Sequence, residues 1–469
     1  MSKISSLLTA GRRSLANSQA SLQTVGHNIA NKTTEGYSRQ RVELVTAPSA
    51  TIGNLQVGMG ARTSAVTRTN NPWLEKQIQK ETTNMGFSDA RAEGMARVEQ
   101  VYNEQLNKGL NQYMTDFFNA FRELSANPES LAARTMVREA GVALGNDFGR
   151  VVGQLNSIQD DLDFQTTTTI EEINQITKEI ASLNERVKVI EVQGQSANDE
   201  RDRRDLLLKK LGEKIDITWG EAKDGSISVT GGKSAILVSG TGSSALKVIE
   251  SDQGQRPKIA VAGFGGLSGD VGEHITGGRL GGILGVREGV IKDLLGHVDN
   301  LAYTIAEEVN KAHVEGFDQN GRQGVLFFNM PKGVSGAGAS LKVNQMVVND
   351  VRRIAAAAQP GAPGDNTIAN MIATVQNRRI MSDGTSTLDD YYNAQVGQVG
   401  TVAQRAVKAQ ESQKNIVGQL ANIRESISGV SLDEEATKMI EFQKMYDASA
   451  RLIRTADEMF DTLLRLKPM

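Results

Sequence analysis

Hydrophobic residues near both ends of the chain recur at alternating intervals of four and three residues. Such spacing is typical of coiled-coil helices. The N-terminal seam runs along Ile4, Leu8, Gly11, Leu15, Ser18, Leu22, Val25 and Ile29, and the C-terminal seam along Leu432, Ala436, Met439, Gln443, Tyr446, Ala450, Ile453, Asp457, Phe460 and Leu464. The pattern predicts that the two helices pack through Leu8, Leu15, Leu22 and Ile29, and through Leu432, Met439, Tyr446, Ile453, Phe460 and Leu464.

Turn and cap residues mark where these helices begin and end. Asn31 and Gly36 follow the first seam, and the alternation from Tyr37 to Leu44 predicts an extended arm after it. Ser431 with Glu434 three residues later is a capping-box pattern before the second seam. A lone helix of about 25–30 residues is only marginally stable in water. The two ends must therefore pair, either with each other in one monomer or with neighbouring copies in an assembly, and the spacing does not distinguish these alternatives.

The interior changes from helical to strand-like periodicity and back. Residues 72–215 carry apolar residues mostly at helical spacing, and a turn near 194–198 predicts two long antiparallel helices. Between 216 and 276 the strand-like runs 227–230 and 235–238 are separated by Gly-rich turns. This stretch predicts a β domain that is inserted into the helical frame and makes few contacts with the core of that frame. Helical spacing then returns at 284–313 and again from about 367.

The predicted fold is therefore mainly α with an inserted β domain. It consists of coiled-coil-like terminal helices, a long-helix bundle domain and a small Gly-rich β domain. The predicted segments are 1–71 (N-terminal helix and arm), 72–216 (bundle, first part), 217–276 (β domain), 277–430 (bundle, second part, with a mixed loop region) and 431–469 (C-terminal helix).

Length and composition narrow the class of protein. A chain of 469 residues exceeds what one hydrophobic core usually serves, so several packed units are expected. Aromatic residues make up only 4%, which predicts that no thick aromatic core forms. A formal net charge of −3 gives no general attraction for nucleic acid. No apolar run approaches the roughly 20 residues of a membrane span, and the N-terminus lacks a signal-peptide core, so neither membrane insertion nor cleaved-signal export is expected.

The sequence offers little for catalysis or metal binding. It contains no Cys, and none of its four His stands at the i,i+4 spacing of a helical metal pair. Gly232–Ser234 resembles the end of a P-loop but lacks the earlier Gly, and Gly263–Gly269 lacks the third Gly of a dinucleotide fingerprint. Asp318–Gly321 lacks the closing Glu of a calcium loop. We read all three as turns and predict no catalytic residue, metal or cofactor, and hence no enzyme.

One string near the N-terminus is more specific than the periodicity. His27 to Gln40 closely resembles the signature of flagellar axial proteins, and its matching residues are Asn28, Ile29, Ala30, Asn31, Thr34, Gly36, Tyr37, Arg39 and Gln40. The run Tyr37-Ser38-Arg39-Gln40 is closer to the first hook-associated protein family than to rod or hook subunits. Strings at 428–436 and 455–464 match the other end of that family. His27 departs from the pattern, since the family more often has Asn there.

The resemblance implies a structural subunit of the bacterial flagellum at the junction between hook and filament. It implies export through the flagellar type III channel without signal cleavage, followed by assembly into an extracellular ring whose paired terminal helices line the axial core. The implied partners are other copies of the chain, hook subunits, the neighbouring junction protein, the filament cap during growth, and a cytoplasmic export chaperone that holds the C-terminal helix. The alternative is another axial subunit, such as a hook, rod or second junction protein.

Overall fold

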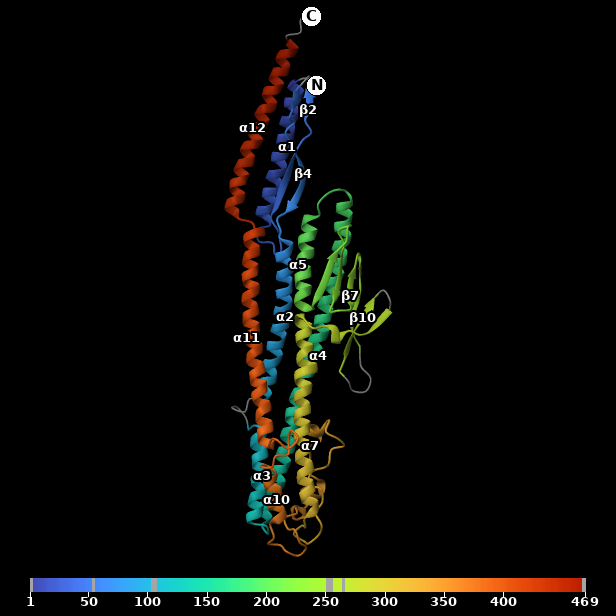
Figure 1. Ribbon diagram of the computed structural model, residues 1–469, viewed down its shortest axis with the longest axis vertical. Coiled ribbons are helices and arrows are strands. Elements are labelled where there is room, and N and C mark those ends of the chain that lie inside the picture. Colours follow the sequence, from blue (N-terminus) through green and yellow to red (C-terminus); the bar gives the residue numbers. More distant parts are fainter. Residues whose placement is uncertain (1–2, 53–54, 103–107, 250–255, 264–265, 466–469) are drawn as a thin grey trace. The chain divides into compact units, whose positions relative to one another are not determined.

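The computed structural model describes residues 3–52, 55–102, 108–249, 256–263 and 266–465, and helices dominate it (Figure 1). The α-helices are α1 (Lys3–Ala30), α2 (Pro72–Val101), α3 (Leu110–Ala126), α4 (Leu131–Val192), α5 (Asn198–Lys214), α6 (Gly278–Leu284), α7 (Lys292–Glu315), α8 (Ala337–Ser340), α9 (Gln345–Asn349), α10 (Thr367–Val375), α11 (Leu388–Ser428) and α12 (Leu432–Arg465). A π-helical stretch at Gly285–Ile291 joins α6 to α7, and short 3₁₀ turns occupy Gly272–His274 and Val351–Arg353.

The strands form small antiparallel sheets. They are β1 (Gln40–Thr46), β2 (Ala50–Ile52), β3 (Leu55–Val57), β4 (Ala61–Arg68), β5 (Ile217–Glu221), β6 (Ile227–Gly231), β7 (Ala235–Ser239), β8 (Gly242–Ser243), β9 (Ala245–Ile249), β10 (Lys258–Gly263) and β11 (Gly266–Asp270). Strands β5, β6, β7 and β8 make one sheet in that order, and β10 lies between β9 and β11 in another. The predicted strand runs at 227–230 and 235–238 correspond to β6 and β7, so the predicted mainly α fold with a small β region is confirmed.

The chain folds into two compact units. Residues 1–86, 169–278 and 412–469 form the first, which we call the terminal unit, and residues 87–168 and 279–411 form the second, which we call the aromatic unit. The terminal unit contains both chain ends, the arm and the whole β domain. This division differs from the five sequence segments, whose boundaries stay a prediction.

In the terminal unit the two ends of the chain pair with each other. Helices α1 and α12 run antiparallel, because the end of α1 at Asn28 meets the start of α12 at Glu435, while Gly11 meets Ile453 (Figure 1). Small residues on α1 allow this close approach: a Cβ on Gly11 would lie 2.9 Å from Ile453 Cγ1, and the Ser14 and Ser449 hydroxyls are 2.7 Å apart. The pairing within one chain is therefore the arrangement that the free monomer adopts.

The arm that follows α1 is a two-stranded ribbon rather than a single extended segment. Strand β1 pairs with β4 antiparallel from Gln40 opposite Arg68 to Thr46 opposite Ala61, with a bulge at Glu43/Leu44. An isolated two-stranded ribbon is marginal in water. Asn17 of α1 supports this one: its amide donates to Ala61 O at 2.9 Å and its oxygen accepts from Thr63 N at 3.0 Å.

The β domain is fastened to the helices beneath it by two asparagines of α4. Asn174 donates to Leu246 O at 2.8 Å and accepts from Leu246 N at 2.7 Å; Asn184 does the same with Ile227 at 2.8 and 3.2 Å. We call a helix asparagine that bonds a chain segment in both directions an asparagine clamp. Buried apolar side chains also line this region, among them Ile173, Ile180, Val187, Ile227, Leu237 and Leu246. The prediction that the β domain makes few contacts with the frame is therefore wrong.

The aromatic unit holds a dense cluster of phenylalanines. Phe117 and Phe121 of α3 and Phe327 of the loop after α7 are fully buried, and their ring centroids are 5.2–5.6 Å apart. Phe118 and Phe328 complete the cluster. A third asparagine clamp holds the loop, since Asn310 exchanges two 2.9 Å hydrogen bonds with Phe328. The prediction from composition that no thick aromatic core forms is wrong, because the few aromatics are concentrated here.

Candidate assembly site

The N-terminal signature lies where the end of α1, the start of the arm, α5 and the start of α12 meet. We call this meeting point the terminal junction. All of these elements belong to the terminal unit. The signature residues come together because Asn31 ends the helix and Gly36 turns the chain. The Asn31 amide donates to His27 O at 3.1 Å, Thr34 Oγ1 donates to Asn31 Oδ1 at 3.1 Å, and Gly36 has φ +83°, which favours glycine.

Asn28 is the centre of the terminal junction. Its side chain is buried, and all four of its hydrogen bonds are made. The amide donates to Gln40 O and to Glu435 Oε2, both at 2.9 Å, and the oxygen accepts from Gln40 N at 2.9 Å and from the Tyr37 hydroxyl at 2.8 Å. Asn28 is thus a further asparagine clamp, and it joins α1, the arm and α12 through one side chain.

The carboxylate of Glu435 in the first turn of α12 is 1% exposed and is held by a cation of the arm. Arg39 Nε donates to Glu435 Oε1 at 2.8 Å, and Arg39 Nη1 forms an ion pair with Glu434 at 2.9 Å. The backbone N–H of Arg39 also donates to Ser428 O at 2.9 Å. A buried carboxylate with a cation and an amide on its oxygens is compensated, and it also lies at the favourable end of the α12 dipole.

The predicted capping residues of α12 take part in this arrangement in a different way. Glu434 pairs with Arg39, and the backbone oxygen of Ser431 accepts from Glu435 N at 3.0 Å. Sequence reasoning therefore found the residues at the start of α12 but did not find the buried Glu435, whose neighbours in the fold are nearly 400 positions away in the chain.

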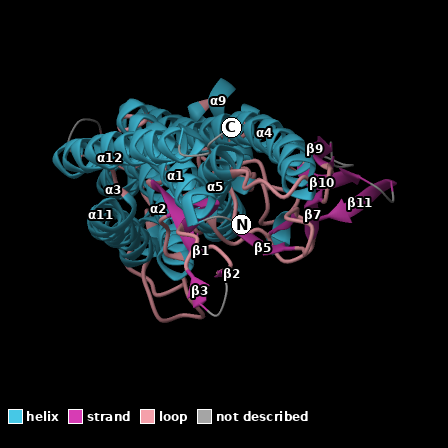
Figure 2. Cartoon of the chain, turned by 90° about the horizontal axis from the view of Figure 1, so that it is seen from above, coloured by secondary structure: helices cyan, strands magenta, loops and turns pink. Residues whose placement is uncertain are grey.

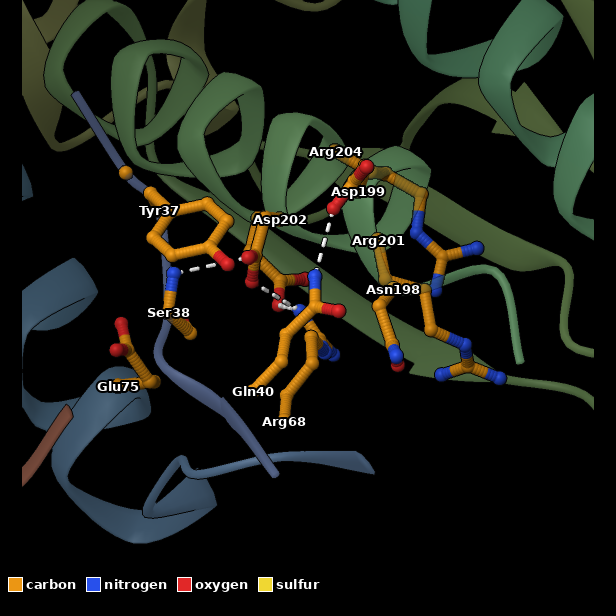
Figure 3. A network of polar contacts seen from close by, with 12 residues as sticks. Tyr37, Ser38, Gln40, Arg68, Glu75, Asn198, Asp199, Arg201, Asp202 and Arg204 are labelled. Atoms are coloured by element: carbon orange, nitrogen blue, oxygen red, sulfur yellow. Dashed lines mark hydrogen bonds and ion pairs between the residues drawn. The ribbon is translucent and has the colours of Figure 1, made fainter. Parts of the chain in front are cut away.

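Helix α5 holds the other side of the arm (Figure 3). Asp202 accepts from Ser38 N at 2.9 Å and from Arg68 Nη1 at 2.7 Å, and Gln40 Nε2 donates to Asp199 at 2.7 Å. Burial raises the pKa of Asp202, against the pull of Arg68. Burial, together with the nearby carboxylates of Asp199, Asp202 and Glu435, also raises the pKa of Tyr37, so its hydroxyl remains a donor to Asn28.

A second set of charges fastens α11 to the same turn. Arg424 donates to Gly36 O at 3.0 Å and pairs with Glu75 of α2 at 3.0 Å; Lys209 of α5 pairs with Glu75 as well. Burial alone would raise the pKa of Glu75, but the cations Lys209 and Arg424 lower it. His27 sits at the rim of this turn, with Nδ1 3.0 Å from the Tyr37 hydroxyl and Nε2 3.5 Å from Asp199.

The side chains predicted to pack along the terminal helices divide into two groups. Leu8, Leu15, Leu22, Ile29, Met439 and Ile453 are half-buried, whereas Leu432, Tyr446 and Phe460 are 37–43% exposed, and the side chain of Leu464 lies outside the described part. The face of α12 that turns toward α1 carries Glu435, Met439, Phe442, Ser449, Ile453 and Ala456. Half of the predicted positions therefore point elsewhere in the single chain, and their packing in an assembly stays a prediction.

The stretches once compared with enzyme motifs form turns or loops. Gly232–Ser234 connects β6 to β7, and Gly232 has φ +55°. Asp318 accepts from Asn320 N at 2.8 Å and pairs with Arg353 at 2.8 Å, so its carboxylate is used inside the loop. Gly263–Gly269 lies partly outside the described residues. Among the described residues no group of three metal-ligating side chains gathers, and no described helix has the length and apolar character of a membrane span.

Comparisons with known proteins give the family. Residues 95–328 match the model of the flagellar hook-associated protein FlgK helical domain. Flagellar hook-associated protein 1 of Bacillus subtilis is 29% identical, with 97% of each chain covered, and that of Escherichia coli is 25% identical, with 99% of this chain and 100% of the relative covered. The chain belongs to the flagellar hook-associated protein 1 family. Its end, residues 424–466, also matches the C-terminal model of the flagellar basal body rod proteins.

A solved member of the family has the same fold. The flagellar hook junction protein FlgK of Burkholderia pseudomallei superposes with a TM-score of 0.66 at 15% identity, covering 75% of this chain and all of that one. The family resemblance predicted from the signature strings is therefore confirmed. The terminal junction gives that signature a physical meaning, because its Asn, Gly, Tyr, Arg and Gln are the residues that join the two ends of the chain.

Proposed function

We propose that this chain is a structural subunit of the bacterial flagellum that joins hook to filament. The observation that carries the proposal is the terminal junction, in which Asn28 and Arg39 of the N-terminal signature hold the buried Glu435 of α12. A subunit of a continuous axial structure needs both of its ends brought together as one element, and this junction does so. The hook-associated protein 1 relatives and the helical-domain match support the hook–filament junction as the location.

The proposal includes what an axial subunit of this kind requires. The chain would leave the cell through the flagellar export channel without signal cleavage and assemble with other copies into an extracellular ring. Its paired terminal helices would face the axis, with hook subunits on one side and the next junction protein on the other. The filament cap during growth, and an export chaperone that holds α12 in the cytoplasm, are the further partners. Its role is structural, and no step of it requires catalysis.

A second axial role has one specific observation in its favour. Residues 424–466 match the C-terminal model of rod proteins, so this segment alone suits a rod or hook subunit as well. The helical-domain match over residues 95–328 belongs to the hook-associated proteins and favours the junction instead. Localisation of the protein to one short zone between hook and filament, rather than along the rod or hook, would decide between these roles.

The experiment that tests the proposal is deletion of the gene, followed by imaging of the flagella. We expect hooks that end without filaments, and restored filaments when the wild-type chain is supplied. Filaments of normal length on the deletion strain would contradict the proposal. A finer test is Ile453→Asp, which places a charge against α1 beside Gly11, where an unpaired charge costs several kcal/mol.

The Ile453→Asp chain should keep the unfolding transition of the aromatic unit and yet fail to restore filaments. Asp457→Asn is the matched control, because it changes the charge of an exposed residue on the same helix. Full-length filaments with Ile453→Asp would show that the α1–α12 pair is not needed for the junction.

A further inference from the structure

The outer face of α12 carries apolar side chains that nothing in the described chain covers. Met445, Leu452 and Met459 are 41%, 40% and 52% exposed and stand seven residues apart, so they form one stripe along the helix. Acidic residues accompany this stripe: Glu441, Asp447 and Glu458 are exposed and form no ion pair among the described residues. We call this surface the acidic stripe.

The arm shows the opposite character on its own outer side. Leu44 and Val45 of β1 are 47% and 39% exposed. Arg41, with a side chain 69% exposed, reaches only the neighbouring Glu43, at 3.4 Å, and Arg12 on the outer side of α1 forms no ion pair among the described residues. We call this surface the basic arm.

The two surfaces carry the charge imbalance of the segments they belong to. Residues 1–71 contain eight Lys and Arg but only two Asp and Glu, whereas residues 432–465 contain eight Asp and Glu and five Lys and Arg. Within one chain the printed contacts use little of this imbalance: Arg39 with Glu434 and Glu435 is the ion pairing between the two segments in the described residues. The remaining opposite charges are free to attract a second copy.

The geometry keeps these two surfaces from meeting within one chain. Helix α1 packs against both α12 and the β1–β4 ribbon, and it lies between them when the chain is seen from above (Figure 2). Leu452 lies beside Gly11, whereas the arm contacts Asn17 of the same helix. A helix with its side chains is about 10–12 Å across, so an intramolecular contact between arm and stripe is blocked by α1.

Two different complementary surfaces on opposite sides of a subunit produce head-to-tail contacts, and these close into rings when the rotation allows. We propose that the basic arm of one copy packs on the acidic stripe of the next copy, with Leu44 and Val45 against Met445, Leu452 and Met459. This inference rests on the proposed function and adds the direction of the contact between copies. It makes the N-terminal arm the donor surface and the outer face of the C-terminal helix the acceptor.

Because the chain has no Cys, engineered cysteine pairs report on this contact without background. The test uses flagella isolated from cells that carry Val45→Cys together with Met445→Cys, Leu452→Cys or Met459→Cys, treated with a mild oxidant. Positions seven residues apart sample steps of about 10 Å along α12, so the three pairs cover the possible registers. A disulfide needs Cα atoms within about 7 Å, a distance that α1 prevents within one copy.

We expect at least one of the three double variants to form a ladder of covalent multimers, while each single variant stays monomeric. Ser14→Cys with Ser449→Cys is the positive control: these hydroxyls lie 2.7 Å apart in one chain, so this pair should close within the monomer. A single α12 variant that forms dimers alone would replace the head-to-tail contact with a symmetric one. Filaments that form normally with no ladder from any of the three pairs would place the interface elsewhere.

These outcomes are distinct from failure of the proposed function. If the deletion strain keeps its filaments, the junction role is lost whatever the cysteines do. If the deletion strain loses them and the cysteine variants restore them without crosslinks, only the arm-to-stripe contact is overturned.

Discussion

The aromatic core and the α1–α12 pair represent two ways of holding helices together. In the first, Phe117, Phe121 and Phe327 fill the interior with fully buried rings. In the second, Gly11 and Ser14 let two helices approach closely, and polar contacts at Asn28 fix one end. Burial of a large apolar side chain contributes roughly 1.5–3 kcal/mol, so the aromatic core carries its own stability. The terminal pair buries less and leaves apolar surface exposed, which suits an element that completes its packing in an assembly.

The largest effect that this comparison predicts is for Phe117→Ala. The ring is fully buried among four other phenylalanines, so its removal leaves a cavity and should lower the free energy of unfolding of the aromatic unit by about 3–5 kcal/mol. Urea unfolding of the purified monomer measures it. The control is Met459→Ala on the exposed side of α12, which should change stability by less than about 0.5 kcal/mol. Equal losses for the two variants would erase the distinction between the regions.

The next effect concerns pH and the buried histidine of the aromatic unit. His313 lies against Phe327, and its ring is bonded to two backbone groups: Nδ1 to Val325 O at 2.5 Å, and Nε2 to Ala355 N at 2.9 Å. Because the Ala355 N–H is a donor, Nε2 must be unprotonated. Burial lowers the pKa of His313 from 6.5 to about 4.

The folded pKa of His313 is therefore below the unfolded one, so the unfolded chain binds more protons between about pH 6.5 and 4. Stability should be lost as pH falls through that window, by about 3 kcal/mol in total from this group, and should not change further below it. Unfolding of the wild type and of His313→Gln across pH 4–7.5 measures the difference, with His297→Gln as the control. A variant that keeps the wild-type pH slope would show that His313 is not its source.

The smallest effect is expected in the terminal region, from Asn28→Asp. The new side chain cannot donate to Gln40 O, and as a carboxylate it would face Glu435, so the junction should weaken by about 1–3 kcal/mol. The loss should be local: hydrogen exchange should rise in β1 and in the first turn of α12, while the unfolding of the aromatic unit stays unchanged. The same substitution at Asn310, clamped to Phe328, sharpens the comparison, because there it should lower the global transition. Two variants with the same global loss would contradict the separation of the regions.

The sequence predicted the helices well because their apolar stripes are local patterns. The stripe Leu294, Val298, Leu301, Ile305 and Val309, for example, is buried along one side of α7. The signature around Asn28 and Gly36 was found as well, but only as a resemblance. What it does depends on Glu435, and no local pattern announces a contact across the whole chain.

The misses have physical causes of the same kind. The aromatic core joins Phe117, Phe118 and Phe121 on α3 to Phe327 and Phe328 in a loop, and a composition of 4% aromatics says nothing about where they gather. The α12 seam was shifted because two apolar rows run along that helix, and periodicity cannot tell the row that faces α1 from the row that faces outward. Asn174 and Asn184 were unremarkable residues of a helix, and their role depends on strands that follow more than forty positions later.

Those two asparagines also have a consequence for how the β domain finds its alignment. In a strand, successive side chains point to opposite faces, so a slip of one residue would turn Ile227 and Leu246 from the interior to solvent. A clamp bonds the N–H and the C=O of one particular residue, Ile227 for Asn184 and Leu246 for Asn174. A slipped strand would present neither pair to the amide, and both hydrogen bonds would be lost together with the buried side chain. The helix thus serves as a template that selects the strand register while the sheet forms.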